Sequence, residues 1–254
     1  MISIEDLSKN YGGKKALQQL TLNIKSGEIF GFLGHNGAGK STTLKSLVSI
    51  IEPTSGTITV DDLDLKEHRQ TIKEKIAYVP DTPDIFLQLT AMEYWDLLAA
   101  AYDLSENEVK QRRQKLVDLF NMGEHVDETL ASFSHGMRQK SVLIGALLSD
   151  PDIWILDEPM QGLDPQATYD LKQLMKAHAA KGKTVIFSTH NLDTAQQLCD
   201  ELAILKQGKL IYNGSVNDLL AQHDNESLES IYLKMAGRQG DGHLVDDIEG
   251  ETHE

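Results

Sequence analysis

The segment Gly34–Ser41 constrains the fold of this chain more than any other. It reads Gly-His-Asn-Gly-Ala-Gly-Lys-Ser, the pattern G-x-x-x-x-G-K-S, and it directly follows the apolar run Ile29–Leu33. In that context the pattern predicts a strand, then a loop whose backbone N–H groups face phosphate oxygens, then a helix that begins at Lys40. Such a loop is expected in an α/β core in which helices cover a largely parallel sheet.

The residue types of this loop have chemical reasons. Glycines let the backbone curl around phosphate oxygens, and the N-terminus of the next helix adds partial positive charge. Lys40 is placed to reach the β- and γ-phosphates, and the Ser41 hydroxyl to join the coordination shell of Mg²⁺. The predicted nucleotide contacts are Gly34, His35, Asn36, Gly37, Ala38, Gly39, Lys40, Ser41 and Thr42. By itself the loop indicates a nucleoside triphosphate, and it does not distinguish a kinase, a GTPase, a helicase or a transport ATPase.

Two adjacent acids follow the apolar strand predicted at Ile153–Leu156. Asp157, at the end of that strand, can hold Mg²⁺ through its water shell. Glu158 is placed to polarise the attacking water as a general base. Because the pair follows a phosphate loop in the same core, it predicts a site that hydrolyses the bound triphosphate.

The order of apolar runs predicts the organisation of the chain. Strands are expected within residues 1–34 and at 57–60, 76–79, 153–156, 184–188, 201–205 and 209–212, and helices at 40–50, 165–180 and 192–198. Residues 89–148 have apolar side chains at helical spacing and no convincing strand, which predicts a helical lobe inserted into the α/β core.

The fold class that we expect is α/β, a RecA-like P-loop NTPase core with an N-terminal antiparallel β-subdomain and an inserted α-helical subdomain. The expected domains are residues 1–88, the β-subdomain and first part of the core; 89–148, the helical subdomain; 149–222, the remaining core; and 223–254, a C-terminal helix with an acidic tail. The tail, from Gly240 onward, has few large apolar residues and six acids, which predicts disorder.

Composition excludes several classes of protein. The formal charge of −15 and pI near 5.0 argue against a nucleic-acid partner, because such binding needs a basic surface. No apolar stretch approaches the roughly 20 residues of a membrane span, and no secretion signal opens the chain, so direct membrane insertion is not expected. The single cysteine, Cys199, excludes an intrachain disulfide and is interpreted as a buried structural thiol.

Several further segments resemble one family closely. Phe133–Gln139 (Phe-Ser-His-Gly-Met-Arg-Gln) is similar to the signature motif of ABC-type ATPases, usually L-S-G-G-Q. Gly162–Pro165 resembles their D-loop and Ser188–His190 their switch-histidine segment, while Tyr11 stands where the family places an aromatic ring against adenine. The resemblance covers approximately residues 1–220, and it is carried by the order of all these motifs.

The resemblance implies a composite site. In the family, the signature of one subunit binds the γ-phosphate of the nucleotide on the opposite subunit, so Ser134 and Gly136 are expected to contact ATP across a head-to-tail dimer. His190 would contact the γ-phosphate and Asp164 would communicate between the two sites. A complete set of site residues favours a homodimer over a heterodimer with a related ATPase.

Three positions depart from the family pattern. His135 stands where glycine is common and Met137 where glutamine is common, although Ser134 and Gly136 are kept. Asp81 replaces the glutamine of the Q-loop, where it could reach Mg²⁺ or the nucleotide only with a loop adjustment. An acid at this position resembles a subgroup of bacterial ATPases that serve ABC-2-like and Ecs-like exporters, which favours export over import.

The leading hypothesis is therefore the ATP-hydrolysing subunit of an ABC transporter. It would bind ATP and Mg²⁺ and act on a separate transmembrane permease subunit from the cytoplasmic face of the cell membrane. The alternative is a soluble ABC ATPase of translation or DNA repair, which usually has two cassettes, long coiled coils or zinc modules; this chain has one phosphate loop and one cysteine. A switch that barely hydrolyses ATP is disfavoured by intact Lys40, Asp157, Glu158 and His190.

Overall fold

The structure, a computed structural model, describes residues 1–223, 226–235 and 237. The chain begins with an antiparallel sheet of order β2-β1-β4-β5. Its strands are β1 Ile2–Tyr11, β2 Lys14–Ile24, β4 Ser55–Val60 and β5 Leu63–Asp64. The turn between the first two strands is Gly12-Gly13, with φ of 53° and 101°, a conformation that glycine adopts without steric cost and that matches the twist of a hairpin.

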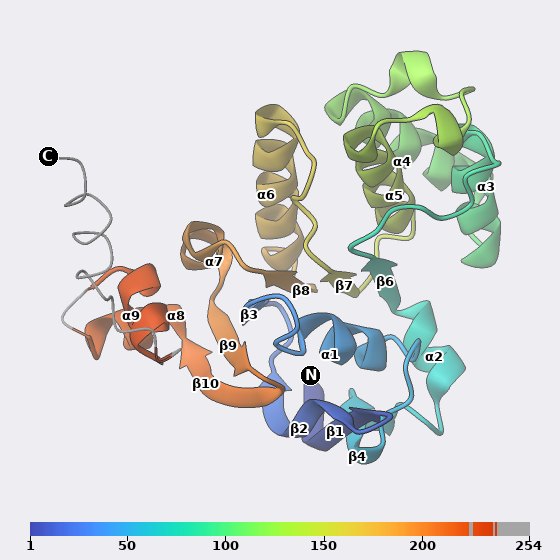
Figure 1. The fold of residues 1–254 in the computed structure, drawn as a ribbon. Helices are drawn as coiled ribbons and strands as arrows, with labels where there is room; N and C mark the ends of the chain where they lie inside the picture. The colour runs from blue at the N-terminus through green and yellow to red at the C-terminus, as the bar shows by residue number, and fades with distance from the viewer. Residues whose placement is uncertain (224–225, 236, 238–254) are drawn as a thin grey trace, which may run out of the picture.

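The second sheet is the core of the molecule (Figure 1), with strand order β10-β9-β3-β8-β7-β6. Its strands are β3 Ile29–Leu33, β6 Ile76–Val79, β7 Ile153–Leu156, β8 Thr184–Thr189, β9 Glu201–Lys206 and β10 Lys209–Ser215. All neighbours pair in parallel except β9 and β10. Every residue of β3, β7 and β8 is buried, as expected of central parallel strands covered on both faces.

Alternating side chains of the parallel sheet build two separate cores. Ile153 and Ile155 of β7 face the antiparallel sheet and helix α1 (Lys40–Leu47), which lies between the two sheets (Figure 1). Trp154 and Leu156 face the opposite side, where α6 (Pro165–Ala179) and the helical lobe pack. Because successive side chains of a strand point to opposite faces, the same sheet packs against the antiparallel sheet with α1 on one face and against α6 with the helical lobe on the other.

The short helix α2 (Arg69–Glu74) precedes β6, and the helical lobe follows that strand. It contains α3 Ala91–Ala101, α4 Glu106–Leu119 and α5 His135–Leu148, with short 3₁₀ turns between the last two. The ring of Trp95 is fully buried in the lobe and its indole N–H donates to the Ser141 carbonyl at 2.9 Å, which joins α3 to α5.

The C-terminal elements pack beside β9. They are α7 Leu192–Leu198, α8 Val216–Ala221 and α9 Leu228–Met235. Their buried residues form a third core with Leu33, Leu202 and Ile204 of the parallel sheet. Cys199, free and just beyond α7, packs its thiol against Gly31, and burial raises the pKa of that thiol.

The expected fold class is confirmed, and most expected strands lie where they were predicted. The first helix is shorter than predicted, because it ends at Leu47 and Ser49 adopts a left-handed φ of 55°. Sequence patterns missed β5 and α2, which are too short to show a period. The predicted acidic tail lies outside the described residues. Among the residues described, no helix has the length and apolar character needed to span a membrane.

Candidate functional site

The predicted phosphate loop connects β3 to α1. Gly39, with φ of 114°, is the N-cap of α1, and no side chain caps that helix N-terminus. The backbone N–H groups of the first turn are therefore not taken by a side chain and remain for an anion. The Ala38 amide donates to the His35 carbonyl at 3.0 Å and closes the loop on itself.

Neighbouring backbone fixes the position of this loop. A Cβ atom on Gly34 would lie 2.6 Å from the Leu205 carbonyl oxygen, and one on Gly39 would lie 2.9 Å from the Ala16 carbonyl oxygen. The Gly208 amide donates to the Ala38 carbonyl at 2.8 Å. Only glycine fits at the two tight positions, so the glycines of the pattern also serve close packing.

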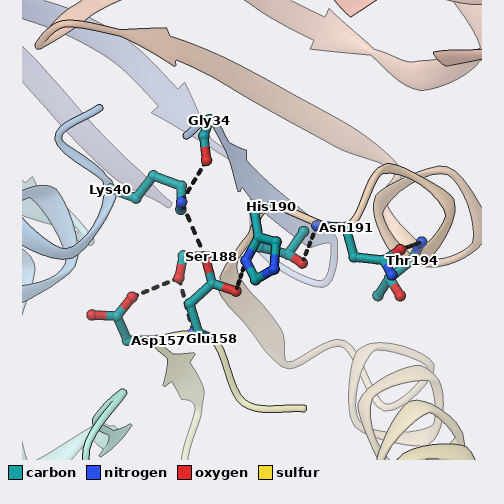
Figure 2. Close-up of polar contacts among 9 residues, drawn as sticks. Gly34, Lys40, Asp157, Glu158, Ser188, His190, Asn191 and Thr194 are labelled. Carbon is teal, nitrogen blue, oxygen red and sulfur yellow. Dashed lines mark hydrogen bonds and ion pairs between the residues drawn. The ribbon is translucent and has the colours of Figure 1, made fainter. Parts of the chain in front are cut away.

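The carboxylate of Glu158 lies at the centre of a polar network (Figure 2). One of its oxygens is 3.1 Å from the Lys40 ammonium, and the other is 3.0 Å from Nδ1 of His190. Lys40 also donates to the Gly34 carbonyl at 2.5 Å. Glu158 has a left-handed φ of 46°, an uncommon conformation outside glycine, and the chain turns there at the end of β7.

Asp157 is fully buried beside this network. Ser188 donates to one carboxylate oxygen at 2.6 Å, while the other, Oδ2, has no hydrogen-bond partner among the residues that the structure describes. Burial raises the pKa of Asp157, the charge of Asp81 adds to that shift, and hydrogen bonds from Ser188 and Ser41 oppose it. Because the amide of Glu158 also donates to Ser188, at 2.9 Å, this serine holds both acids in place.

Lys40 and Glu158 of this network line a pocket of about 410 Å³, whereas Asp157 and His190 are not among its lining residues. Of the predicted residues, Tyr11, His35, Asn36, Gly37, Gly39, Lys40, Ser41, Thr42, Asp81 and Glu158 line it. Lys14, Ala16 and Gln161 also line it, and the sequence patterns missed them. Lys14 is separated from Tyr11 only by the Gly12-Gly13 turn, and this closeness in sequence could have indicated that Lys14 lines the pocket too. Gly34 and Ala38 belong to the loop but do not line the pocket.

Asp81 and Tyr11 lie at the rim of the pocket. A carboxylate oxygen of Asp81 lies 3.6 Å from the ammonium of Lys45, which is on α1, so the charge of Asp81 has a partner in the chain. Tyr11 is 45% exposed, and the Lys9 ammonium lies 5.0 Å from the centre of its ring. An exposed aromatic ring beside a phosphate loop can stack on a nucleotide base.

The signature segment is not among the residues that line this pocket. Ser134 is exposed and caps α5, because its hydroxyl accepts from the Met137 amide at 3.2 Å. A Cβ atom on Gly136 would overlap the carbonyl oxygen of Gly162, and one on Gly162 would overlap the His135 ring. The signature therefore packs tightly against the D-loop of its own chain.

Asp164 closes the D-loop. Its carboxylate caps α6 by accepting from the Ala167 amide at 2.8 Å and pairs with the Lys140 ammonium at 2.7 Å. The hydrogen bond from Lys140 lowers the pKa of Asp164. Since Lys140 lies on α5, this ion pair connects the helical lobe to α6.

Comparison of the sequence with known families decides the identity of this arrangement. Residues 17–161, more than half of the chain, match the family model described as ABC transporter. This chain belongs to the ABC transporter family. It is an ATP-binding subunit of that family and an ATPase, as its curated relatives and structural neighbours also indicate.

Two of the relatives align over nearly their full length. The ABC transporter ATP-binding protein NatA of Bacillus subtilis is 33% identical over 92% of this chain and 97% of its own. The ABC-type transporter ATP-binding protein EcsA of the same organism is 33% identical over 96% and 99%. A Nod factor export ATP-binding protein of Ralstonia nicotianae is 29% identical over 91% of this chain and 72% of its own.

Solved structures agree with the family. An ATP-binding subunit of an ABC transporter superimposes with a TM-score of 0.87, at 35% identity over 92% of this chain and 99% of its own. A dimeric ATP-binding cassette in a post-hydrolysis state, bound to ADP and phosphate, superimposes with a TM-score of 0.76, at 26% identity over 85% and 99%.

Proposed function

We propose that two copies of this chain form a head-to-tail dimer that binds two ATP molecules at the interface. The observation that supports it is the separation of Ser134 and Gly136 from the pocket of their own chain. A helix N-terminus with an exposed serine hydroxyl suits phosphate, so the phosphate that it binds would come from the pocket of the partner copy. The dimeric cassette among the structural neighbours supports the same arrangement.

Residues in and beside the pocket fit a Mg²⁺ ion. The buried Oδ2 of Asp157 and the hydroxyl of Ser41, which lines the pocket and lowers the pKa of that carboxyl, are the hard oxygen donors that Mg²⁺ prefers. We assign them as the residues that hold the ion, with Asp81 contributing after a change of its pairing with Lys45. When bound, Mg²⁺ would neutralise charge on the β- and γ-phosphates.

The remaining roles follow from the polar network. Lys40 would exchange its pairing with Glu158 for the β- and γ-phosphates, which releases that carboxylate to accept a proton from the attacking water. The exposed imidazole of His190, held at 3.0 Å by Glu158, would contact the γ-phosphate. Tyr11 would stack on adenine, and Asp164 would link the two sites through its ion pair with Lys140.

We also propose that the ATPase energises export through a separate transmembrane subunit, from the cytoplasmic face of the membrane. Support for export comes from a relative that is named for Nod factor export, and support for transport from similarity to EcsA, a transporter ATP-binding protein, across 96% of the chain. The acidic residue Asp81 in the Q-loop position points the same way.

An affinity pull-down from detergent-solubilised membranes of the native host tests this proposal. Recovery of a polytopic membrane protein in near-stoichiometric amount would support transport, and ATP-dependent efflux from vesicles containing that complex would establish export. Recovery of ribosomal or DNA-repair proteins alone, with the ATPase in the soluble fraction, would contradict it and favour the soluble alternative.

A further inference from the structure

The C-terminal helix α9 contacts the phosphate loop directly. The ring of Tyr232 on α9 packs edge-on against the imidazole of His35, with centroids 5.3 Å apart and ring planes at 67°. His35 is an exposed loop residue that lines the nucleotide pocket, whereas Tyr232 is only 6% exposed. A buried tyrosine ring thus packs against the side chain of an exposed residue of the phosphate loop.

The buried face of α9, which carries Tyr232, explains why its ring is held in place. Leu228 and Ile231 are buried with it in the third core, which also contains Leu33, the last residue of β3. Leu33 immediately precedes Gly34, so the core that holds Tyr232 adjoins the start of the loop. The helix also packs on α7, which begins just after His190 and Asn191.

His35 lies in the loop between Gly34 and Gly39, the two positions that neighbouring backbone approaches closely. Its carbonyl accepts from Ala38, but the close backbone approaches are made by Gly34 and Gly39 on either side. An edge-to-face aromatic contact has a preferred geometry and contributes beyond its buried area. Side-chain packing by Tyr232 therefore restrains the His35 imidazole within the loop.

We infer that Tyr232 is a positioning residue for ATP binding, which holds the phosphate loop through His35. The inference rests on the proposed role of residues 34–42 in binding phosphate. It adds a contribution to the nucleotide site from a helix beyond residues 17–161, the span of the family match.

The test measures the Kd for ATP by calorimetry and the KM and kcat of ATPase activity. Tyr232→Ala should raise Kd and KM by about two- to tenfold, the range expected for an aromatic pair, with kcat within about twofold of wild type. Tyr232→Phe, which keeps the ring, should bind ATP more tightly than Tyr232→Ala. Tyr232→Leu keeps an apolar side chain in the core of α9 but removes the ring, so it should show the same rise in Kd. It takes the place of Tyr232→Ala if the alanine variant does not fold.

Two controls separate positioning from stability. Ile231→Val thins the same core without touching the ring contact, so it should lower Tm and leave Kd unchanged. In a His35→Ala background, Tyr232→Ala should have no further effect on Kd, because the partner ring is gone.

Several outcomes would overturn the inference. These are an unchanged Kd in both Tyr232→Ala and Tyr232→Leu, an equal rise in Kd for Ile231→Val, a failure of Tyr232→Phe to bind more tightly than Tyr232→Ala, or an undiminished effect of Tyr232→Ala without His35. Lys40→Ala is measured in parallel. If that variant still binds ATP normally, the phosphate-loop assignment fails, which is a different result from a failure of the Tyr232 contact alone.

Discussion

The carboxylate of Glu158 lies 3.1 Å from the Lys40 ammonium and 3.0 Å from the His190 imidazole. The residue proposed to activate water thus joins the residue proposed to bind phosphate to the one proposed to contact the γ-phosphate. Lys40 and Glu158 come from α1 and the end of β7, and His190 directly follows β8. A phosphate that pairs with the Lys40 ammonium would therefore also remove the ion-pair partner of Glu158.

Glu158→Gln should separate binding from hydrolysis. The amide keeps the shape of the side chain but cannot accept a proton, so we expect ATPase activity to fall by about 10²–10⁴-fold, the usual contribution of a general base. ATP binding should persist, and the dimer should accumulate. Size-exclusion chromatography with Mg²⁺ and ATP checks this. A variant that elutes only as monomer would show that the dimer or the base assignment is wrong.

Lys40→Ala should abolish ATP binding in practice. Charge-assisted hydrogen bonds contribute about 1.5–3 kcal/mol each, and Lys40 is expected to contact both the β- and γ-phosphates, so a loss of about 100-fold or more in affinity is expected. Calorimetry with ATP measures it. Lys66→Ala, at a lysine whose side chain is 86% exposed and outside the pocket, is the matched control and should bind normally.

Gly136→Ala should impair hydrolysis and leave ATP binding intact. The new methyl group would overlap the Gly162 carbonyl and displace the D-loop, while the pocket of the same chain is not lined by either glycine. A misplacement of about 1 Å at a catalytic site can cost about 100-fold in rate. Steady-state ATPase assays alongside calorimetry check this.

Gly123→Ala is the matched glycine control for that experiment. A Cβ atom there meets only Val117 Cγ1, at 3.9 Å, so activity should stay at the wild-type level. Equal losses of activity in the two variants, or loss of ATP binding in Gly136→Ala, would contradict the role assigned to the signature and D-loop contact.

His178 should make the fold less stable in mild acid. Burial of its imidazole against Trp154 lowers the pKa of His178, and nearby Lys183 adds to the shift. As pH falls through the unfolded-state pKa of about 6.5, the unfolded chain binds a proton that the folded chain resists, so unfolding becomes easier until the pH passes below the folded-state pKa. Above pH 6.5 the residue adds little pH dependence.

Thermal unfolding between pH 7.5 and 5 measures this effect, with both limits set about one unit or more from that pKa. His178→Gln should show a smaller fall in Tm across the range than wild type, whereas His68→Gln, at an exposed histidine, should follow wild type. An identical fall in Tm for wild type and His178→Gln would exclude the buried imidazole as the cause.

The local parts of the site could be predicted without the fold. The phosphate loop and the acids after β7 each combine an apolar strand with the residue types that the chemistry needs, whereas the histidine after β8 was predicted from the resemblance to ABC-type ATPases. The fold class followed from the same alternation of strands and helices. Short elements such as β5 and α2 could not be predicted, since a few residues carry no period.

How these parts come together depends on long-range packing. The order β3-β8-β7 places Lys40, His190 and Glu158 at the same edge of the sheet, and that order is not the order of the chain. The support that Ser188 gives to both acids, and the contact of Tyr232 with His35, join residues distant in sequence. Such contacts depend on how whole elements pack against one another, whereas a motif depends only on its immediate neighbours along the chain.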